Sequence, residues 1–288
     1  MGKFIQYRTK DSLYDGPFDG KAGWASAGLG NVVVTDGGHL IVIDGGKAND
    51  AEELVTLLEA ETSGGGPKID LWIITHPHLD HYGAIQEICE NESLRSRIAV
   101  DRFVWWFPED FCDRNGQQNA LGYGNTDMEK ICRVMGAEGH RPARDEVIAV
   151  DETEIRFLYV PDDCSILNTA GGNPNLCSLI FTVTGSQRKV MVTGDAYGRT
   201  MKMTVWRYAK ELKCDVLQMP HHFCCDAYCD DFYKLVDPQI VLIPASIAGN
   251  RAMHTEYAET DGGRTNLRAE ARAEQVYRAF EGTVELLI

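Results

Sequence analysis

The stretch Thr75-His76-Pro77-His78-Leu79-Asp80-His81 places four metal-binding side chains within six positions. It follows the apolar run 69–74, which is rich in β-branched and aromatic residues and too short for a typical helix, so we expect a buried strand there. Alternate residues of an extended chain point the same way, so His76 and His78 can hold one cation between them. Imidazole and carboxylate ligands suit zinc, iron or manganese. Two ligands facing one way and two offset from them predict two adjacent cations.

Three other apolar runs also end in polar residues that can bind or support a metal. They are Leu40-Ile41-Val42-Ile43-Asp44-Gly45-Gly46, Val190-Met191-Val192-Thr193-Gly194-Asp195 and Val216-Leu217-Gln218-Met219-Pro220-His221-His222. In this order, and with the His-x-His-x-Asp-His motif, they resemble the signature set of the metallo-β-lactamase superfamily over about residues 23–288. Strand groups interrupted by helices in both halves fit a layered α/β fold. The resemblance implies the αββα four-layer sandwich, with the site along one edge of two packed sheets.

The resemblance also implies how the ligands are shared. His76 and His78 would hold one ion, Asp80 and either His221 or His222 the other, and Asp195 would bridge them. His81 is a further candidate ligand, and Asp44 would orient a ligand histidine from behind. Two divalent ions are implied, zinc first, with manganese or iron as alternatives.

The loop 173–178 lacks the histidine that many members of the superfamily carry there. Its Asn175 and Ser178, followed by Thr-Gly-Asp and His-His, resemble the ComEC-type branch, and so does a late Asn250…His254 pair. This implies supporting or substrate-binding roles for Asn175, Ser178 and Asn250. Asp80 and His254 would be catalytic, with His254 donating a proton to a leaving group or holding an oxyanion.

The chain departs from that branch in two respects. It has Phe223 and Cys224 after His-His, where the branch usually has Gly-Ser, and it lacks the membrane segments of a competence protein. Because Asn175 replaces a histidine, we expect the cation at His76 and His78 to be bound by few protein ligands and therefore loosely.

Two cations about 3.5–4 Å apart can share and deprotonate a water molecule, which suits phosphoester or acyl hydrolysis. We therefore predict a metal-dependent hydrolase of phosphodiester or phosphomonoester substrates. Two alternatives remain: a mononuclear iron oxidoreductase of the sulfur-dioxygenase type, which needs a third histidine on the first metal, and a lactone or thioester hydrolase. A non-catalytic binding domain would be expected to have lost ligands.

Composition limits the partners and the compartment. The net charge of −15 argues against duplex nucleic acid, since such affinity comes mainly from Lys and Arg neutralising phosphates; we expect a small-molecule or phosphoester substrate. No apolar run approaches the roughly 20 residues of a membrane span, and the first residues lack the apolar core of a secretory signal. Nine cysteines, an odd number without paired spacing, favour a reducing compartment, so we predict a cytoplasmic protein.

The cysteines nearest the last histidines are Cys224, Cys225 and Cys229. They could serve as soft metal ligands or as a redox switch, but we favour reduced cysteines packed as small apolar residues, because histidines and carboxylates already supply the usual ligands.

We expect residues 1–22 to form an arm or edge strand and residues 23–288 a single domain, with an insertion at about 108–145 that lies over the site. Helical spacing and breakers predict helices at 50–60, 127–135, 201–212 and 267–280. Hairpins are predicted at 32–43, 147–160 and 179–193, and single strands at 98–107, 216–219, 239–243 and 283–287.

Overall fold

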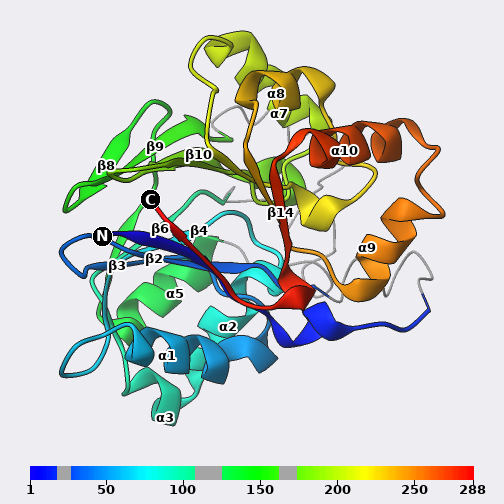
Figure 1. Ribbon diagram of the computed structural model, residues 1–288. Coiled ribbons are helices and arrows are strands. Elements are labelled where there is room, and N and C mark those ends of the chain that lie inside the picture. The colour runs from blue at the N-terminus through cyan, green and yellow to red at the C-terminus, as the bar shows by residue number, and fades with distance from the viewer. Residues whose placement is uncertain (18–26, 108–124, 162–173) are drawn as a thin grey trace.

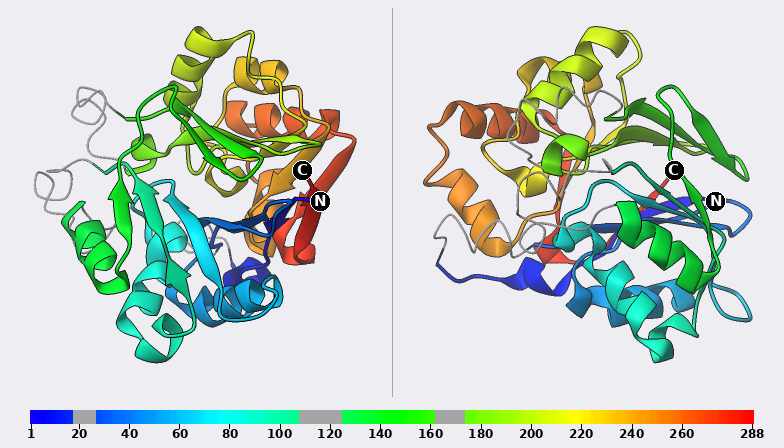
Figure 2. Two further views of the ribbon diagram at one scale, coloured as in Figure 1. Left: turned by 90° about the vertical axis from the view of Figure 1, so that its left-hand side faces the viewer. Right: turned by 180° about the vertical axis from the view of Figure 1, so that it is seen from behind.

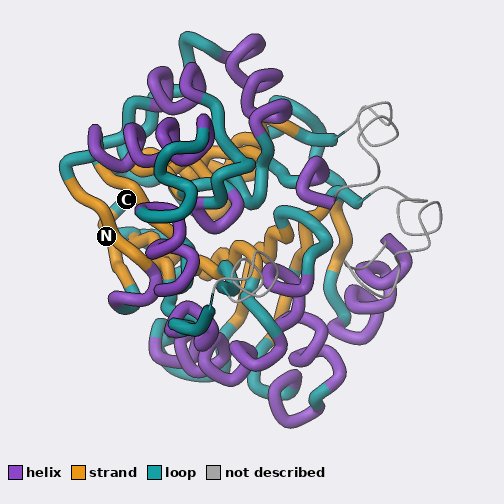
Figure 3. Tube along the Cα trace, turned by 90° about the vertical axis from the view of Figure 1, so that its right-hand side faces the viewer, coloured by secondary structure: helices purple, strands orange, loops and turns teal. Residues whose placement is uncertain are grey.

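Two mixed β-sheets pack face to face, and helices cover the outer side of each (Figure 1). The computed structural model describes residues 1–17, 27–107, 125–161 and 174–288. Viewed from another side, the strands lie between the helices (Figure 3). The predicted αββα four-layer sandwich is confirmed.

The first sheet has eight strands, and its N-terminal and C-terminal strands are neighbours. In order across the sheet they are β15 (Val284–Leu287), β1 (Lys3–Gln6), β2 (Gly30–Val34), β3 (Leu40–Asp44), β4 (Lys68–Ile74), β6 (Arg102–Trp105) and β7 (Glu138–His140), and β5 (Ala99–Val100) also pairs with β4. The two chain ends therefore lie side by side (Figure 2).

The second sheet has seven strands. In order they are β14 (Gln275–Arg278), β13 (Ile240–Ile243), β12 (Val216–Gln218), β11 (Lys189–Val192), β10 (Ile180–Thr184), β9 (Thr153–Tyr159) and β8 (Val147–Val150). Strands β3 and β4 run parallel in the first sheet, as do β11 and β12 in the second. Parallel neighbours end at the same edge of a sheet, so the polar residues that follow these strands are brought together there.

The outer layers consist of helices that bury one apolar face. The helices on the side of the first sheet are α1 (Ala51–Ala60), α2 (Leu79–Glu90), α3 (Glu92–Arg95) and α5 (Asn125–Met135). The helices on the side of the second sheet are α7 (Gly198–Tyr208), α8 (Asp230–Val236), α9 (Ile247–His254) and α10 (Asp261–Arg272). None of these described helices is long and apolar enough to span a bilayer.

Strand β4 shows why the sandwich forms. Leu71 and Ile73 pack into the core between the two sheets, whereas Trp72 and Ile74 pack under the outer helices. The sequence of a strand that is buried on both faces is a continuous apolar run rather than an alternation of apolar and polar residues. Because β4 ends at Ile74, the polar sequence that follows it begins at the edge of the sheet.

One sequence prediction needs correction. The helix predicted at 267–280 is α10, which ends at Arg272, and the chain then forms β14 (Gln275–Arg278) alongside β13. Pairing with a neighbouring strand outweighed local helical spacing there. Thr260 fixes the true start of the helix, since its side chain accepts a hydrogen bond from the Gly263 amide.

The expected insertion over the site stays a prediction, since its residues 108–124 lie outside the described residues. The part that follows forms α5, which packs against α2 in the outer helix layer through Met128 and Ile131, and then β7 at the sheet edge. The described portion of 108–145 thus belongs to the layers of the fold.

Candidate metal centre

The first four ligand candidates come from the end of β4 and the start of α2. Thr75 follows the strand, and its carbonyl accepts a hydrogen bond from the Leu179 amide of the other sheet at 3.0 Å. Gly194 packs closely against Thr75. Its φ is +50°, and a Cβ at this position would lie 2.8 Å from Thr75. The absence of a side chain at Gly194 lets the loop carrying Asp195 approach the histidine motif.

Asp195 stands at the middle of the histidines, with 1% of its surface exposed. Its Oδ1 lies 3.1 Å from His81 Nε2 and 3.7 Å from His222 Nε2. Its Oδ2 lies 3.5 Å from His76 Nε2 and 3.8 Å from His221 Nε2. The two carboxylate oxygens therefore face two different groups of side chains.

Each group has the geometry of a cation site. In the first, one ligand atom each from His76, His78 and Asp195 lies within 4.8 Å of the others; in the second the same holds for Asp80, His81, Asp195 and His222. The sequence left open which of His221 and His222 faces the centre. The structure turns both toward Asp195, with His221 on the Oδ2 side that the first group also faces.

Hydrogen bonds fix which nitrogen of each histidine faces Asp195. The Nδ1 of His81 lies 2.8 Å from Asp44 Oδ2, and that of His221 lies 2.9 Å from Asp226 Oδ1. The Nδ1 of His222 lies 2.9 Å from the Pro244 carbonyl. Ionised carboxylates and carbonyls can only accept, so each of these Nδ1 atoms carries a hydrogen, and Nε2 is the nitrogen left to bind a metal.

Asp44 is the most constrained of these partners. It is fully buried and has φ +57°, a left-handed conformation that aspartate tolerates better than most residues. Besides contacting His81, it accepts hydrogen bonds from the Thr75 amide and hydroxyl, each at 2.8 Å. This contact is the one expected of a residue that orients a ligand histidine.

The backbone of the last histidine motif is unusual. His221, His222 and Phe223 have φ values of 47°, 51° and 67°, and a left-handed conformation is uncommon for residues other than glycine. Such strain persists only where surrounding contacts hold it, and it occurs often at functional sites. Here it directs two adjacent imidazoles toward opposite oxygens of one carboxylate.

Burial and mutual charge set the protonation of the cluster. Burial lowers the pKa of His76 and of His78. Burial would also lower the pKa of His81 and His221, but Asp195 together with Asp44 or Asp226 raises both values instead. The pKa of Asp195 is well below its usual range, because the charges of His81 and His222 outweigh its burial. The carboxylate is thus held ionised.

These residues fit a pair of divalent cations. Both Asp195 oxygens and His78 Nε2 are buried, and within the described part of the chain they make no hydrogen bond of good geometry. His81 Nε2 and His222 Nε2 are 3.3 Å apart, and two facing lone pairs at that distance repel unless a proton or a cation lies between them. Nitrogen and carboxylate ligands are those that zinc prefers.

A comparison with known families identifies this arrangement. The sequence model of the Metallo-beta-lactamase superfamily matches residues 27–239. The chain belongs to the metallo-β-lactamase superfamily. No curated protein sequence matches it.

Solved structures of this superfamily fold superpose over the whole chain. The metallo-β-lactamase fold protein YhfI from Bacillus subtilis has a TM-score of 0.54 at 13% identity, covering 99% of this chain and 100% of that one. Zinc-bound PqqB from Methylobacterium extorquens gives 0.59 at 12%, covering all of both chains. A diphosphatase from the PhnP family gives 0.50 at 12%, covering 100% and 98%. At these identities the similarity concerns the fold.

The remaining candidates lie at different distances from this metallo-β-lactamase centre. Ser178 supports it directly, since its hydroxyl accepts a hydrogen bond from the Asp195 amide at 3.1 Å. Asn175 Nδ2 lies 3.1 Å from His221 Nε2. Asn250 accepts a hydrogen bond from Arg278, and His254 Nε2 is 3.0 Å from Glu270 Oε2. The His254 ring also packs against Phe223, the residue that follows the histidine pair, with ring centroids 6.0 Å apart.

Two supporting residues were missed at the level of sequence. Asp226 follows the histidine pair by a few positions, and an acid so close to a ligand histidine was a usable signal. The Pro244 carbonyl follows β13 and carried no signal, because any residue has a carbonyl. Cys224 and Cys229 are buried, and Cys224 has its sulfur within 4.8 Å of ligand atoms of His221 and Asp226.

Proposed function

We propose that this metallo-β-lactamase superfamily member is a metal-dependent hydrolase of phosphodiesters or phosphomonoesters, with two zinc ions. The observation that carries the proposal is Asp195, whose two oxygens face two separate groups of ligands. Two cations held by these residues would supply a deprotonated water and neutralise charge on the attacked group.

The residues of the chain have separate tasks in this proposal. His76, His78 and His221 would hold one ion and Asp80, His81 and His222 the other, with Asp195 shared. Asp44 and Asp226 would hold the proton of a neutral His81 or His221 on Nδ1, which leaves Nε2 as the nitrogen that binds the metal. The pKa of Asp80 is lowered, since the hydrogen bond and charge of His222 and the charge of His81 outweigh burial, so its carboxylate stays available as an acceptor at neutral pH.

A small phosphoester is the preferred substrate class for two reasons. The similar fold of a diphosphatase from the PhnP family supports phosphoester chemistry. The net charge of −15 disfavours duplex nucleic acid. We also propose that the chain lies near the ComEC-type branch, on the basis of Asn175 and Ser178 in the loop before β10.

The experiment combines metal analysis with a substrate panel. Purified protein is expected to hold two zinc or manganese ions per chain and to hydrolyse bis(4-nitrophenyl) phosphate or 4-nitrophenyl phosphate faster than lactone or thioester compounds. Asp195→Asn should abolish the activity, whereas Asp70→Asn, a change of the same kind at the distant His39–Asp70 pair, should retain it. One iron per chain with oxygen uptake in the presence of a persulfide would instead establish the dioxygenase alternative.

A further inference from the structure

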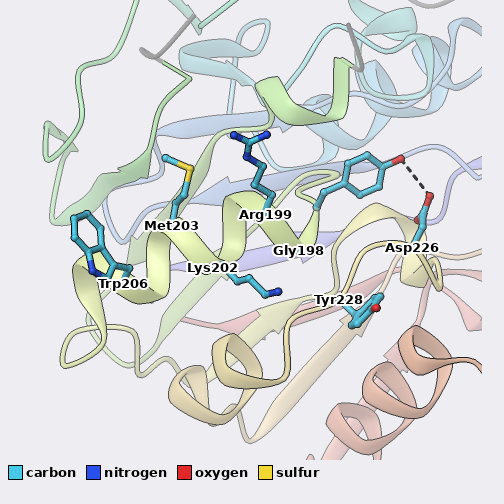
Figure 4. Close-up of a pocket in the computed structure, with 8 residues that line it drawn as sticks. Gly198, Arg199, Lys202, Met203, Trp206, Asp226 and Tyr228 are labelled. Atoms are coloured by element: carbon cyan, nitrogen blue, oxygen red, sulfur yellow. Dashed lines mark hydrogen bonds between the residues drawn. The ribbon is translucent and has the colours of Figure 1, made fainter. Parts of the chain in front are cut away.

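A pocket of 620 Å³ lies beside the metal centre along helix α7 (Figure 4). Sites for small organic ligands commonly occupy about 300–1,000 Å³. The residues that line it come from α7 and from the loop after the histidine pair: Tyr197, Gly198, Arg199, Lys202, Met203, Trp206, Asp226 and Tyr228.

Two of the lining residues also contact a candidate metal ligand. Asp226 Oδ1 lies 2.9 Å from His221 Nδ1, and its Oδ2 accepts a hydrogen bond from the Tyr197 hydroxyl at 3.2 Å. The Tyr197 ring stands edge-on to the His221 ring, with centroids 5.2 Å apart. The imidazole of His221 thus has the metal centre on its Nε2 side and the pocket wall on its Nδ1 side.

The charge of the pocket differs from that of the whole chain. Arg199 and Lys202 are one helical turn apart on α7 and both line the pocket, although the chain carries a net charge of −15. Among the described residues that line it, Asp226 is the only acid, and its two oxygens already contact His221 and Tyr197. In Figure 4 the Lys202 ammonium extends toward Tyr228. A local positive site on an acidic protein attracts an anion selectively.

The apolar part of the lining is flat and accessible. Trp206 is 83% exposed and Tyr228 36% exposed, and both line the pocket together with Met203. Exposed tryptophan is uncommon, because it leaves a large apolar ring in water. An aromatic ring of a ligand could stack on such a surface while its charged group contacts Lys202.

We propose that this pocket binds the part of the substrate that is not hydrolysed, and that this part is an anion bearing an aromatic ring. The proposal rests on the hydrolase function proposed above and names its substrate class. Binding energy from such a remote group lowers KM when it is expressed equally in the ground state and the transition state.

Binding can be tested without catalysis. Benzenesulfonate is an aromatic anion with no bond for this enzyme to hydrolyse, and its binding to the metal-loaded protein can be measured by calorimetry. We expect it to bind at least tenfold more tightly than neutral benzyl alcohol or non-aromatic methanesulfonate. Lys202→Met should weaken binding about tenfold, the size of one charge-assisted contact, and Trp206→Leu should weaken it similarly.

Lys210→Met is the matched control, because it removes the same charge from an exposed position just beyond α7 and outside the pocket lining. Equal weakening by Lys202→Met and Lys210→Met would show a general charge effect and overturn the proposal. So would equal binding of benzenesulfonate and benzyl alcohol.

Kinetics test the link to the substrate. The compounds are a methyl 4-nitrophenyl phosphodiester and a matched diester whose methyl is replaced by a sulfobenzyl group. The sulfobenzyl diester should show a KM about tenfold lower with similar kcat, and Lys202→Met should remove that advantage. Tight benzenesulfonate binding without a KM advantage would refute the pocket as a substrate subsite. Binding without hydrolysis of any ester would instead refute the hydrolase function.

Discussion

Replacing Asp44 with asparagine tests the claim that one buried carboxylate prepares a metal-facing nitrogen. Asn has nearly the same volume as Asp and tolerates the φ of +57° at this position, so the backbone should be retained. Asp44 accepts hydrogen bonds from the Thr75 amide and hydroxyl and contacts His81 Nδ1, each at 2.8 Å. An amide has one acceptor oxygen, so it cannot replace all three contacts.

The expected consequence is a change of the His81 tautomer. With its oxygen retained by Thr75, the Asn amide group would donate to His81 Nδ1, and the ring proton would move to Nε2, the atom 3.1 Å from Asp195. A protonated Nε2 cannot bind a metal. Loss of such a supporting contact typically weakens metal affinity about 10- to 100-fold, which is about 1.4–2.8 kcal/mol.

Competition with a chelator of known zinc affinity would measure the effect, with circular dichroism to confirm the fold. Asp70→Asn is the control, because Asp70 Oδ1 contacts His39 Nδ1 at 3.0 Å in a similar Asp–His pair away from the centre. Zinc affinity of Asp44→Asn within twofold of the wild-type value, or an equal loss in Asp70→Asn, would refute the role assigned to Asp44.

Three further outcomes follow from the same geometry. Asp195→Asn should lower the metal content from two ions per chain to less than one, measured by atomic emission on dialysed protein, because a single amide oxygen cannot serve both ligand groups; retention of two ions would contradict the bridging role. Zinc loading near pH 7 should release protons and should weaken as pH falls, because the raised pKa values of His81 and His221 favour protonation of these ligands in the metal-free protein. Calorimetry in two buffers of different ionisation enthalpy would detect the proton release, and identical heats would argue against it. Gly262→Ala should destabilise the fold by about 1–3 kcal/mol, because a Cβ would lie 1.6 Å from the Cys225 carbonyl oxygen. Thermal denaturation would measure the loss, with the exposed neighbour Asp261→Ala as the comparison. Equal melting temperatures of the two variants would contradict the prediction and mean that the loop 224–229 moves to accommodate the methyl group.

Much of the site was predictable because its ligands follow strands. An apolar run of strand length predicts where the chain reaches a sheet edge, and His76, His78, Asp80 and His81 follow such a run without interruption. Asp44 and Asp195 each come at or just after the end of another strand. Local spacing was sufficient there, because period-two alternation and parallel pairing bring these ends together whatever the details of the loops.

The last part of the chain was less predictable. A helical pattern at 267–280 was interrupted because residues 275–278 complete a sheet as β14, a pairing with residues far away in sequence. His254 was predicted as a catalytic residue, and in the structure its ring packs against Phe223 while Glu270 from α10 lies 3.0 Å from it. The local sequence around a histidine does not predict which distant carboxylate will contact it.

The sequence by itself therefore determined the fold class and the set of ligands that could gather at one edge. Only the tertiary structure decided how the set divides, with His222 facing Asp195 Oδ1 and His221 facing Oδ2. That division depends on the left-handed backbone at 221–223 and on the separate partners of the two rings, the Pro244 carbonyl and Asp226. The physical reason is that adjacent identical side chains have the same intrinsic preferences, so their different directions arise only from what packs around them.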